Sequence, residues 1–194
     1  LGSVIRTFAF GILLAKIVAN KSVNGISLKM IELYIIVFGC RLSSILFYEG
    51  YLPFDSSGDY LYRGMEIAGC VLCILIAIFT VTMYKDTYQS DSDSFGAILG
   101  LPSSIGIVWV MVPAAGLALI FHPSLNSNML TDVAWTFALA LESTAILPQI
   151  IMFIKNLKEA SKKGKDTDQG GWVSHILACL GLARLIHLVF WISS

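Results

Sequence analysis

The chain contains six apolar stretches of about 20 residues, and this pattern leaves few folds open to it. Such a length is what an α-helix needs to cross the hydrocarbon core of a bilayer. Of the 194 residues, 56% are hydrophobic and only 13% are charged, which is too apolar for a soluble domain of this size. A segment in lipid must satisfy its own backbone hydrogen bonds, so all six stretches are predicted to be helices. We therefore expect an all-α polytopic membrane protein.

A single transmembrane domain is predicted to cover residues 1–194. Its spans are expected at about 2–19, 28–47, 60–83, 98–121, 130–154 and 171–194. The fourth region contains Pro102 and Pro113, so we expect a re-entrant or interfacial stretch before the true span, or a strongly kinked helix. The chain starts without Met and is apolar from its first residues, which predicts a processed or incomplete chain.

Lysine residues distinguish the two ends of the predicted bundle. The first, third and fifth loops carry Lys21, Lys29, Lys85, Lys155, Lys158, Lys162, Lys163 and Lys165. The second and fourth loops, about 48–59 and 122–129, contain no Lys or Arg. This bias predicts that the lysine-bearing loops are cytoplasmic and that the N-terminus is lumenal. The basic fifth loop either serves topology alone or also binds anionic lipid.

Three charged side chains, Arg41, Glu142 and Arg184, lie deep in predicted spans. A charge at the bilayer centre costs about 2.5–3.5 kcal/mol or more, so these groups need one another, a ligand or water. The simplest interpretation is an Arg–Glu lock between the second, fifth and sixth spans, and a ligand site is the compatible alternative. Five other charged or titratable residues lie nearer to span ends, where we expect them to snorkel: Lys16, Glu32, Arg63, Glu66 and His175.

The fifth span carries further polar residues. Asp132 lies ten residues before Glu142, close to three helical turns, so both carboxylates can share a face. With Trp135, that face would suit a cationic ligand group, while an acidic helix start and an interfacial aromatic residue are the alternatives. The Pro148-Gln149 pair predicts either a break that exposes backbone groups to a central cavity or an ordinary kink.

No enzymatic constellation is present. The chain has no nucleophile elbow, phosphate loop or metal-ligand motif, and its three histidines are scattered. Cys70 and Cys73 form a C-x-x-C inside an apolar run, which favours small packing residues over redox chemistry. The formal net charge is zero, so we expect no nucleic-acid partner. We also expect no catalysis, no cofactor and no metal.

The tract Trp135–Gln149, with Leu141-Glu142-Ser143 and Ala145-Ile146-Leu147-Pro148-Gln149, resembles one in the receptors that retain ER lumenal proteins, the KDEL receptors. Shorter tracts that resemble the same family, in the same order, are 12–17, 24–29, 37–41, 85–88, 93–95, 112–113, 116–117, 180–184 and 188–191. The resemblance implies a PQ-loop, SWEET-like fold of two three-helix units joined by a linking helix. Of its seven helices this chain would supply six.

The family resemblance implies a lumen-facing cavity that binds the C-terminal Lys-Asp-Glu-Leu of escaped ER proteins at acid pH, in the ER and Golgi. By position, Arg41 matches the arginine that grips the terminal carboxylate. Asp132 matches a glutamate that meets the ligand lysine, and Trp135 matches its neighbouring tryptophan. Three other positions match cavity residues: Glu142, Arg184 and Trp191.

The chain also departs from the family pattern. Arg6 stands where the resemblance places a pH-sensing histidine, and the family's first-helix arginine has no match here. At other expected site positions the chain has Ser44 for an acidic residue, Ala183 for a tyrosine and Ser194 for an arginine. Loss of two of three anion-binding arginines would weaken capture of a peptide with three carboxylates. The ligand site is therefore predicted to be partly degenerate.

Two alternative functions remain open at this point. The first is an accessory subunit that packs against neighbouring subunits of a larger membrane complex, for instance in an organelle inner membrane. The second is a small-solute transporter of the PQ-loop type, with Gln149 and Arg41 as polar contacts.

Overall fold

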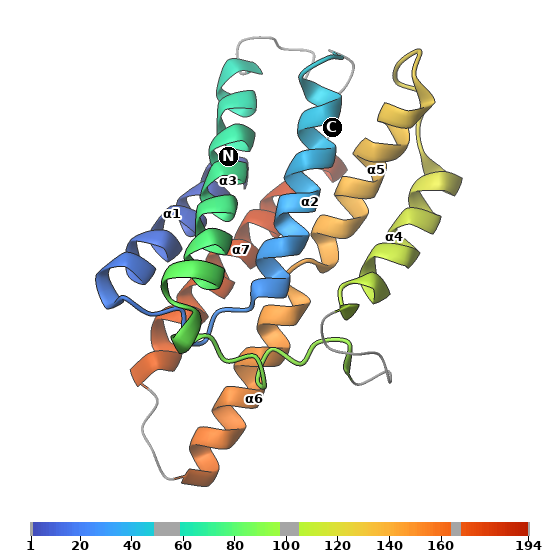
Figure 1. Cartoon of the computed structure of the whole chain (residues 1–194). Coiled ribbons are helices and arrows are strands. Elements are labelled where there is room, and N and C mark those ends of the chain that lie inside the picture. The colour runs from blue at the N-terminus through green and yellow to red at the C-terminus, as the bar shows by residue number, and fades with distance from the viewer. Residues whose placement is uncertain (1, 49–58, 98–104, 164–167, 194) are drawn as a thin grey trace.

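A computed structural model describes residues 2–48, 59–97, 105–163 and 168–193, and over these ranges the chain folds into helices and contains no strand (Figure 1). The α-helices are α1 (Gly2–Asn20), α2 (Leu28–Ile45), α3 (Asp59–Ile78), α4 (Val108–Phe121), α5 (Met129–Thr144), α6 (Leu147–Lys163) and α7 (Asp168–Ser193). A π-helical turn, Phe79–Met83, continues α3, and a 3-10 turn follows at Lys85–Thr87. The prediction of an all-α polytopic membrane protein is confirmed.

Helix α2 lies at the centre of the bundle. It packs against α3 on one side and α5 on the other, and α4 covers the outer side of α5 (Figure 1). Helix α1 packs against both α3 and α7. A side chain on the inner face of α2 can therefore meet partners from several helices at once.

Three helical segments are long and apolar enough to cross a membrane: α1, the stretch 59–83 formed by α3 and its π turn, and the stretch 129–162 formed by α5 and α6. The apolar parts of α4 (108–121) and α7 (172–186) are shorter. Large apolar side chains are exposed on the outside of the bundle, including Val71 and Ile78 on α3 and Ile120 and Phe121 on α4. A soluble protein rarely exposes so much apolar surface, whereas lipid chains would cover it.

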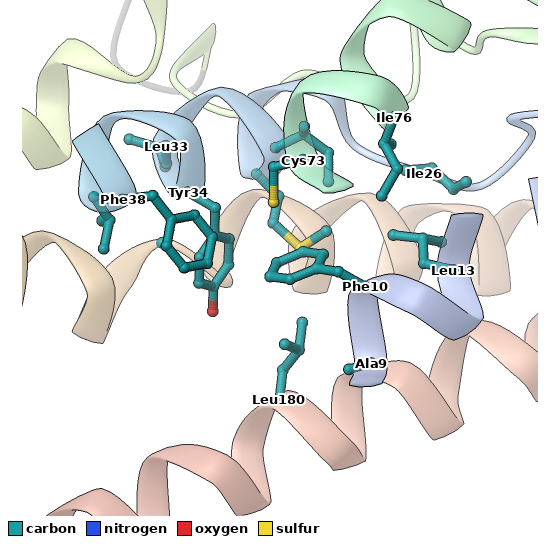
Figure 2. Packing of buried hydrophobic residues seen from close by; sticks show 14 of the residues in the cluster. Ala9, Phe10, Leu13, Ile26, Leu33, Tyr34, Phe38, Cys73, Ile76 and Leu180 are labelled. Atoms are coloured by element: carbon teal, nitrogen blue, oxygen red, sulfur yellow. The ribbon is translucent and has the colours of Figure 1, made fainter. Parts of the chain in front are cut away.

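The apolar core is formed mainly by residues of α1, α2, α3, α5 and α7, and Figure 2 shows part of it. Phe10 of α1 meets Tyr34 of α2 edge to face, with ring centroids 4.9 Å apart. Phe38 lies one turn along α2, 6.3 Å from Phe10, and Leu180 of α7 closes the cluster from the opposite side (Figure 2). These residues are almost fully buried.

The fifth predicted span is interrupted. Helix α5 ends at Thr144, residues 145 and 146 form a turn, and α6 begins at Leu147. Pro148 is the second residue of α6, where a missing backbone donor costs nothing because first-turn N–H groups have no partner within the helix. The sequence prediction of a break at Pro148-Gln149 thus agrees with the structure to within a few residues.

The Gln149 amide joins α6 to the loop between α1 and α2. Its Oε1 accepts a hydrogen bond from Ser27 N at 2.8 Å, and its Nε2 donates to Gly25 O at 2.7 Å. Gln149 is 3% exposed, so both bonds are shielded from water. The backbone of this loop therefore uses the Gln149 amide, which the transporter alternative takes as a polar contact.

Asp93 organises the same end of the bundle. Its carboxylate accepts hydrogen bonds from Ser27 Oγ at 2.8 Å and from Tyr88 OH at 2.7 Å. Lys29 Nζ donates to the Asp93 and Phe95 carbonyls at 2.6 Å and 2.9 Å. Burial, the charge of Asp93 and the hydrogen bond to it raise the pKa of Tyr88, so its hydroxyl remains a donor. We call Ser27, Lys29, Tyr88 and Asp93 the loop clasp.

The fourth predicted region begins partly outside the described residues, because 98–104 lie there. A turn at 105–107 leads into α4, which contains Pro113 within its 14 residues. At 1.5 Å per residue this helix is about 21 Å long, which is short for a bilayer core of about 30 Å. The predicted re-entrant or interfacial stretch, with Pro102, lies largely outside the described residues.

Candidate functional site

Five charged side chains converge inside the bundle, each from a different helix. Glu142 of α5 pairs with Arg6 of α1, Arg41 of α2 and Arg184 of α7, and the Arg184 Nη1–Glu142 Oε2 distance is 2.8 Å. Glu66 of α3 pairs with Arg6 and lies 3.5 Å from Arg41 Nη1. We call these five residues the charge network.

The charge network is buried almost completely. The side chains of Arg6, Arg41, Glu66 and Glu142 are at most 2% exposed, and Arg184 is 25% exposed. Isolated charges at such depth would be very costly, and removal of one partner of a buried pair typically costs about 3–5 kcal/mol. The five residues are therefore expected to hold the helices in one arrangement.

Helix periodicity explains why these side chains meet. Four of the five charged residues, all but Arg184, occupy the buried stripe of their helix, at the spacing of three or four residues that one helical face provides. The stripes are Arg6, Phe10, Leu13 and Ile17 on α1; Tyr34, Phe38, Arg41 and Ile45 on α2; Glu66, Gly69, Cys73 and Ile76 on α3; and Trp135, Ala138, Leu141, Glu142 and Ala145 on α5.

Aromatic rings cover two of the guanidinium groups. Arg6 Cζ lies 4.7 Å from the ring centroid of Phe38, and Arg41 Cζ lies 5.6 Å from that of Trp135. A desolvated cation over an aromatic face gains about 2 kcal/mol. Trp135 thus contacts a cation, as its position suggested, but the cation belongs to Arg41 of the same chain.

Glycine makes the Phe38–Arg6 contact possible. A Cβ atom at Gly69 would lie 2.5 Å from Phe38 Cζ and 2.8 Å from Phe38 Cε1. The ring of Phe38 therefore rests directly on the α3 backbone, one turn beyond Glu66. The same face of α3 provides both a counter-ion for Arg6 and the space for the ring that covers it.

Two guanidinium groups retain unused donors. Within the described part of the chain, the Nε atoms of Arg6 and Arg41 are buried and have no hydrogen-bond partner. Arg41 Nη1 is 3.5 Å from both oxygens of Glu66, longer than the roughly 2.7–2.9 Å of a charge-assisted hydrogen bond. Arg41 is therefore firmly held by Glu142 and only loosely held by Glu66.

Most of the predicted site residues come together. Arg41, Trp135, Glu142 and Arg184 share the charge network or line it. Asp132 is 1% exposed, on the same face of α5 as Glu142 and three turns nearer the start of the helix. Trp191 belongs to α7, but its side chain lies outside the described residues.

The Arg–Glu lock that the sequence suggested is present, and it is larger than expected. Arg6 and Glu66 are additional members. The expectation that Glu66 snorkels to a span end is wrong, because its carboxylate is fully buried between Arg6 and Arg41. Its eighth position in α3, on one stripe with Gly69 and Cys73, is the signal that could have placed it in the interior.

The arrangement defines a class of protein: a polytopic helical membrane protein with a buried, arginine-rich site and no cluster of metal ligands among its described residues. The family model described as "ER lumen protein retaining receptor" matches residues 22–194. The chain belongs to the ER lumen protein-retaining receptor family, a family of receptors.

Individual relatives agree with the family match. The chain is 30% identical to "ER lumen protein-retaining receptor 3" of Mus musculus over 193 residues, covering 99% of this chain and 75% of the relative. It is 30% identical to "ER lumen protein-retaining receptor 2" of Bos taurus over 192 residues, or 98% and 76% of the two chains. A receptor of Entamoeba histolytica is 26% identical over 180 residues, or 93% and 70%.

Proposed function

We propose that the chain is a non-catalytic receptor that binds C-terminal retention peptides of ER lumenal proteins in the ER and Golgi and returns them to the ER. The family membership supports this function. The observation that carries it is the charge network, in which three guanidinium groups face two carboxylates and leave one positive charge in excess. A peptide carboxylate is the group that such a site lacks.

Each proposed contact has a place in the bundle. Arg41 would receive the terminal carboxylate, since its Nη1 and Nε are the loosely held donors of the network. Asp132, on the Glu142 face of α5, would meet the ligand lysine. Arg184 is the partly exposed cation of the network and would meet the ligand first.

Arg6 bears on the pH dependence of binding. An arginine stays protonated at every physiological pH, so this position cannot switch near pH 6 as a histidine does. We expect binding of a Lys-Asp-Glu-Leu peptide to differ less than about threefold between pH 5.5 and 7.4.

The test uses purified protein in mild detergent and a labelled Lys-Asp-Glu-Leu peptide at both pH values. The C-terminally amidated peptide should bind about tenfold more weakly or worse, because it lacks the terminal carboxylate. Arg41→Ala should abolish binding, and Arg184→Gln, which removes one partner of Glu142, should weaken it about tenfold. Lys158→Gln removes an exposed cation from α6 and should change nothing.

Two results would contradict the receptor function. One is the absence of peptide binding at both pH values. The other is binding that is unaffected by amidation of the peptide and by both arginine substitutions. Arg41→Ala removes a buried partner of both Glu142 and Glu66, so this variant can fail to fold. In that case Arg184→Gln and the amidated peptide still decide the test.

One observation favours a structural role as the second candidate. Each carboxylate of the charge network already contacts more than one arginine, as in a bundle that is locked rather than poised for a ligand. An accessory subunit of this kind would co-purify with a stable membrane complex. Purification of the chain as a free monomer in mild detergent would count against it.

A further inference from the structure

The two carboxylates of the charge network are held very differently. Glu142 contacts all three arginines, Arg6 through Oε1 and Arg41 and Arg184 through Oε2. Glu66 has one close partner, Arg6, and a second at 3.5 Å, Arg41. Glu142 is thus the centre of the network, and Glu66 is the carboxylate that the arginines hold less tightly.

Arg41 has a fixed side and a loosely held side. Its Nη2 is bound to Glu142, whereas its Nη1 reaches Glu66 only at 3.5 Å and its Nε has no partner. Arginine favours bidentate contact with a planar carboxylate at about 2.7–2.9 Å. Glu66 lies where such a carboxylate would bind Arg41, but its oxygens are 3.5 Å from Arg41 Nη1, too far for a strong hydrogen bond.

We infer that Glu66 is an internal competitor for a ligand carboxylate at Arg41 and thereby sets the affinity of the site. This inference rests on the proposed receptor function. In the unliganded protein Glu66 partly neutralises Arg41. A ligand carboxylate that binds Arg41 displaces Glu66 onto Arg6, which already holds it closely, and gives a network of three guanidinium groups and three carboxylates.

Competition follows from the charges themselves. The Glu66 carboxylate and an incoming carboxylate would both lie within about 4–6 Å of the same guanidinium, in a site shielded from water, where like charges repel strongly. The burial of Glu66 prevents solvent from screening this repulsion. Removal of the negative charge at position 66 should therefore strengthen ligand binding, although Glu66 is itself a partner of two arginines.

The experiment compares wild type with Glu66→Gln, which keeps the side-chain shape and removes the charge. The probes are the Lys-Asp-Glu-Leu peptide and its C-terminal amide. We expect Glu66→Gln to bind the free-acid peptide about tenfold more tightly than wild type, with a much smaller gain for the amide. Glu159→Gln, the same change at an exposed position on α6, should leave both affinities unchanged.

Failure of the inference and failure of the receptor function give different results. If wild type binds the peptide and Glu66→Gln binds no more tightly, the competitor role is wrong and the receptor function stands. If only Glu66→Gln binds, the competitor role is supported and wild type is not a working receptor. If neither protein binds while both unfold cooperatively on heating, both ideas are wrong.

A second variant covers the case in which Glu66→Gln does not fold. Glu66→Asp keeps the counter-charge for Arg6 but shortens the side chain by one methylene, which withdraws the carboxylate from Arg41. It should tighten binding of the free-acid peptide by a smaller factor than Glu66→Gln. Equal or weaker binding by a folded Glu66→Asp variant would overturn the inference.

Discussion

Gly69 is the residue on which the packing beside the charge network depends. It lets the Phe38 ring contact the α3 backbone, and that ring in turn covers Arg6. Phe38 is fully buried against Phe10 and Tyr34, so it cannot simply rotate away from an added methyl group (Figure 2). The absence of a Cβ atom at Gly69 of α3 thus allows the Phe38 ring to shield the Arg6 guanidinium of α1.

Gly69→Ala should therefore destabilise the bundle by about 1–3 kcal/mol, the usual cost of overpacking a core. Gly64→Ala is the matched control, because it lies in the same helix and an added Cβ meets nothing within 4 Å. Higher helix propensity should make that variant neutral or up to about 1 kcal/mol more stable. The measurement is thermal unfolding in detergent followed by tryptophan fluorescence. Equal Tm values for the two variants would refute the packing argument.

At the scale of helices, periodicity and composition were sufficient to predict most of the elements. Long apolar runs predict helices because a segment in lipid must satisfy its own backbone hydrogen bonds. Pro148 predicts the α5–α6 break because it lacks a backbone donor and is best tolerated in the first turn of a helix. Three of the five residues of the charge network were predictable. Arg41, Glu142 and Arg184 lie far from span ends, but Glu66 sits two turns into α3, where distance from the end does not reveal whether a side chain turns inward or outward.

Arg6 illustrates the other limit of sequence reasoning. Its position in a span was evident, yet its two partners lie 60 and 136 residues away along the chain. No local pattern encodes such pairings, since they depend on how α1, α3 and α5 pack together. The stripe of buried residues on each helix predicts which face is internal, but not which faces meet.

The attachment of α6 depends on the donor of the Gln149 amide. Gln149→Glu keeps the acceptor for Ser27 N but replaces the Nε2 donor with an oxygen that faces Gly25 O. The new oxygen at position 149 and Gly25 O would then be two buried acceptors with no donor between them, which should destabilise the protein by at least about 2 kcal/mol. Gln89→Glu is the control, because Gln89 uses its Oε1 to accept from Asn156 Nδ2, a bond that a carboxylate retains.

A large fall in Tm for Gln149→Glu with little change for Gln89→Glu is expected. Hydrogen exchange would locate the effect: amides of the 24–27 loop and of the first turns of α6 should exchange faster in Gln149→Glu. If those amides keep their wild-type protection, the amide bridge does not hold α6 in place.

At the scale of the whole molecule, the loop clasp and the lysines lie at the same end. Ser27 and Lys29 come from the start of α2, and Tyr88 and Asp93 come from the segment after α3. Lys155 Nζ of α6 reaches the Asp91 carbonyl nearby. Buried hydrogen bonds therefore join the first and third lysine-bearing loops, and an exposed hydrogen bond from Lys155 adds α6. The charge network joins the helices nearer the middle of the bundle.

The clustering of lysines at one end of the bundle predicts the orientation of the chain in its membrane. The lysine-bearing end should face the cytoplasm and the loop 122–128 the lumen.

Ser161→Cys on α6 and Ser127→Cys in that loop are matched substitutions at exposed positions on opposite ends. In sealed ER or Golgi vesicles with the cytoplasmic face outward, a membrane-impermeant maleimide should label Ser161→Cys at once and Ser127→Cys only after detergent is added. Wild type, whose four cysteines are buried or half-buried, provides the background. Labelling of Ser127→Cys in intact vesicles would show the opposite orientation. Asp132 and Trp135, at the start of α5, would then lie at the cytoplasmic end, where a lumenal peptide cannot reach them.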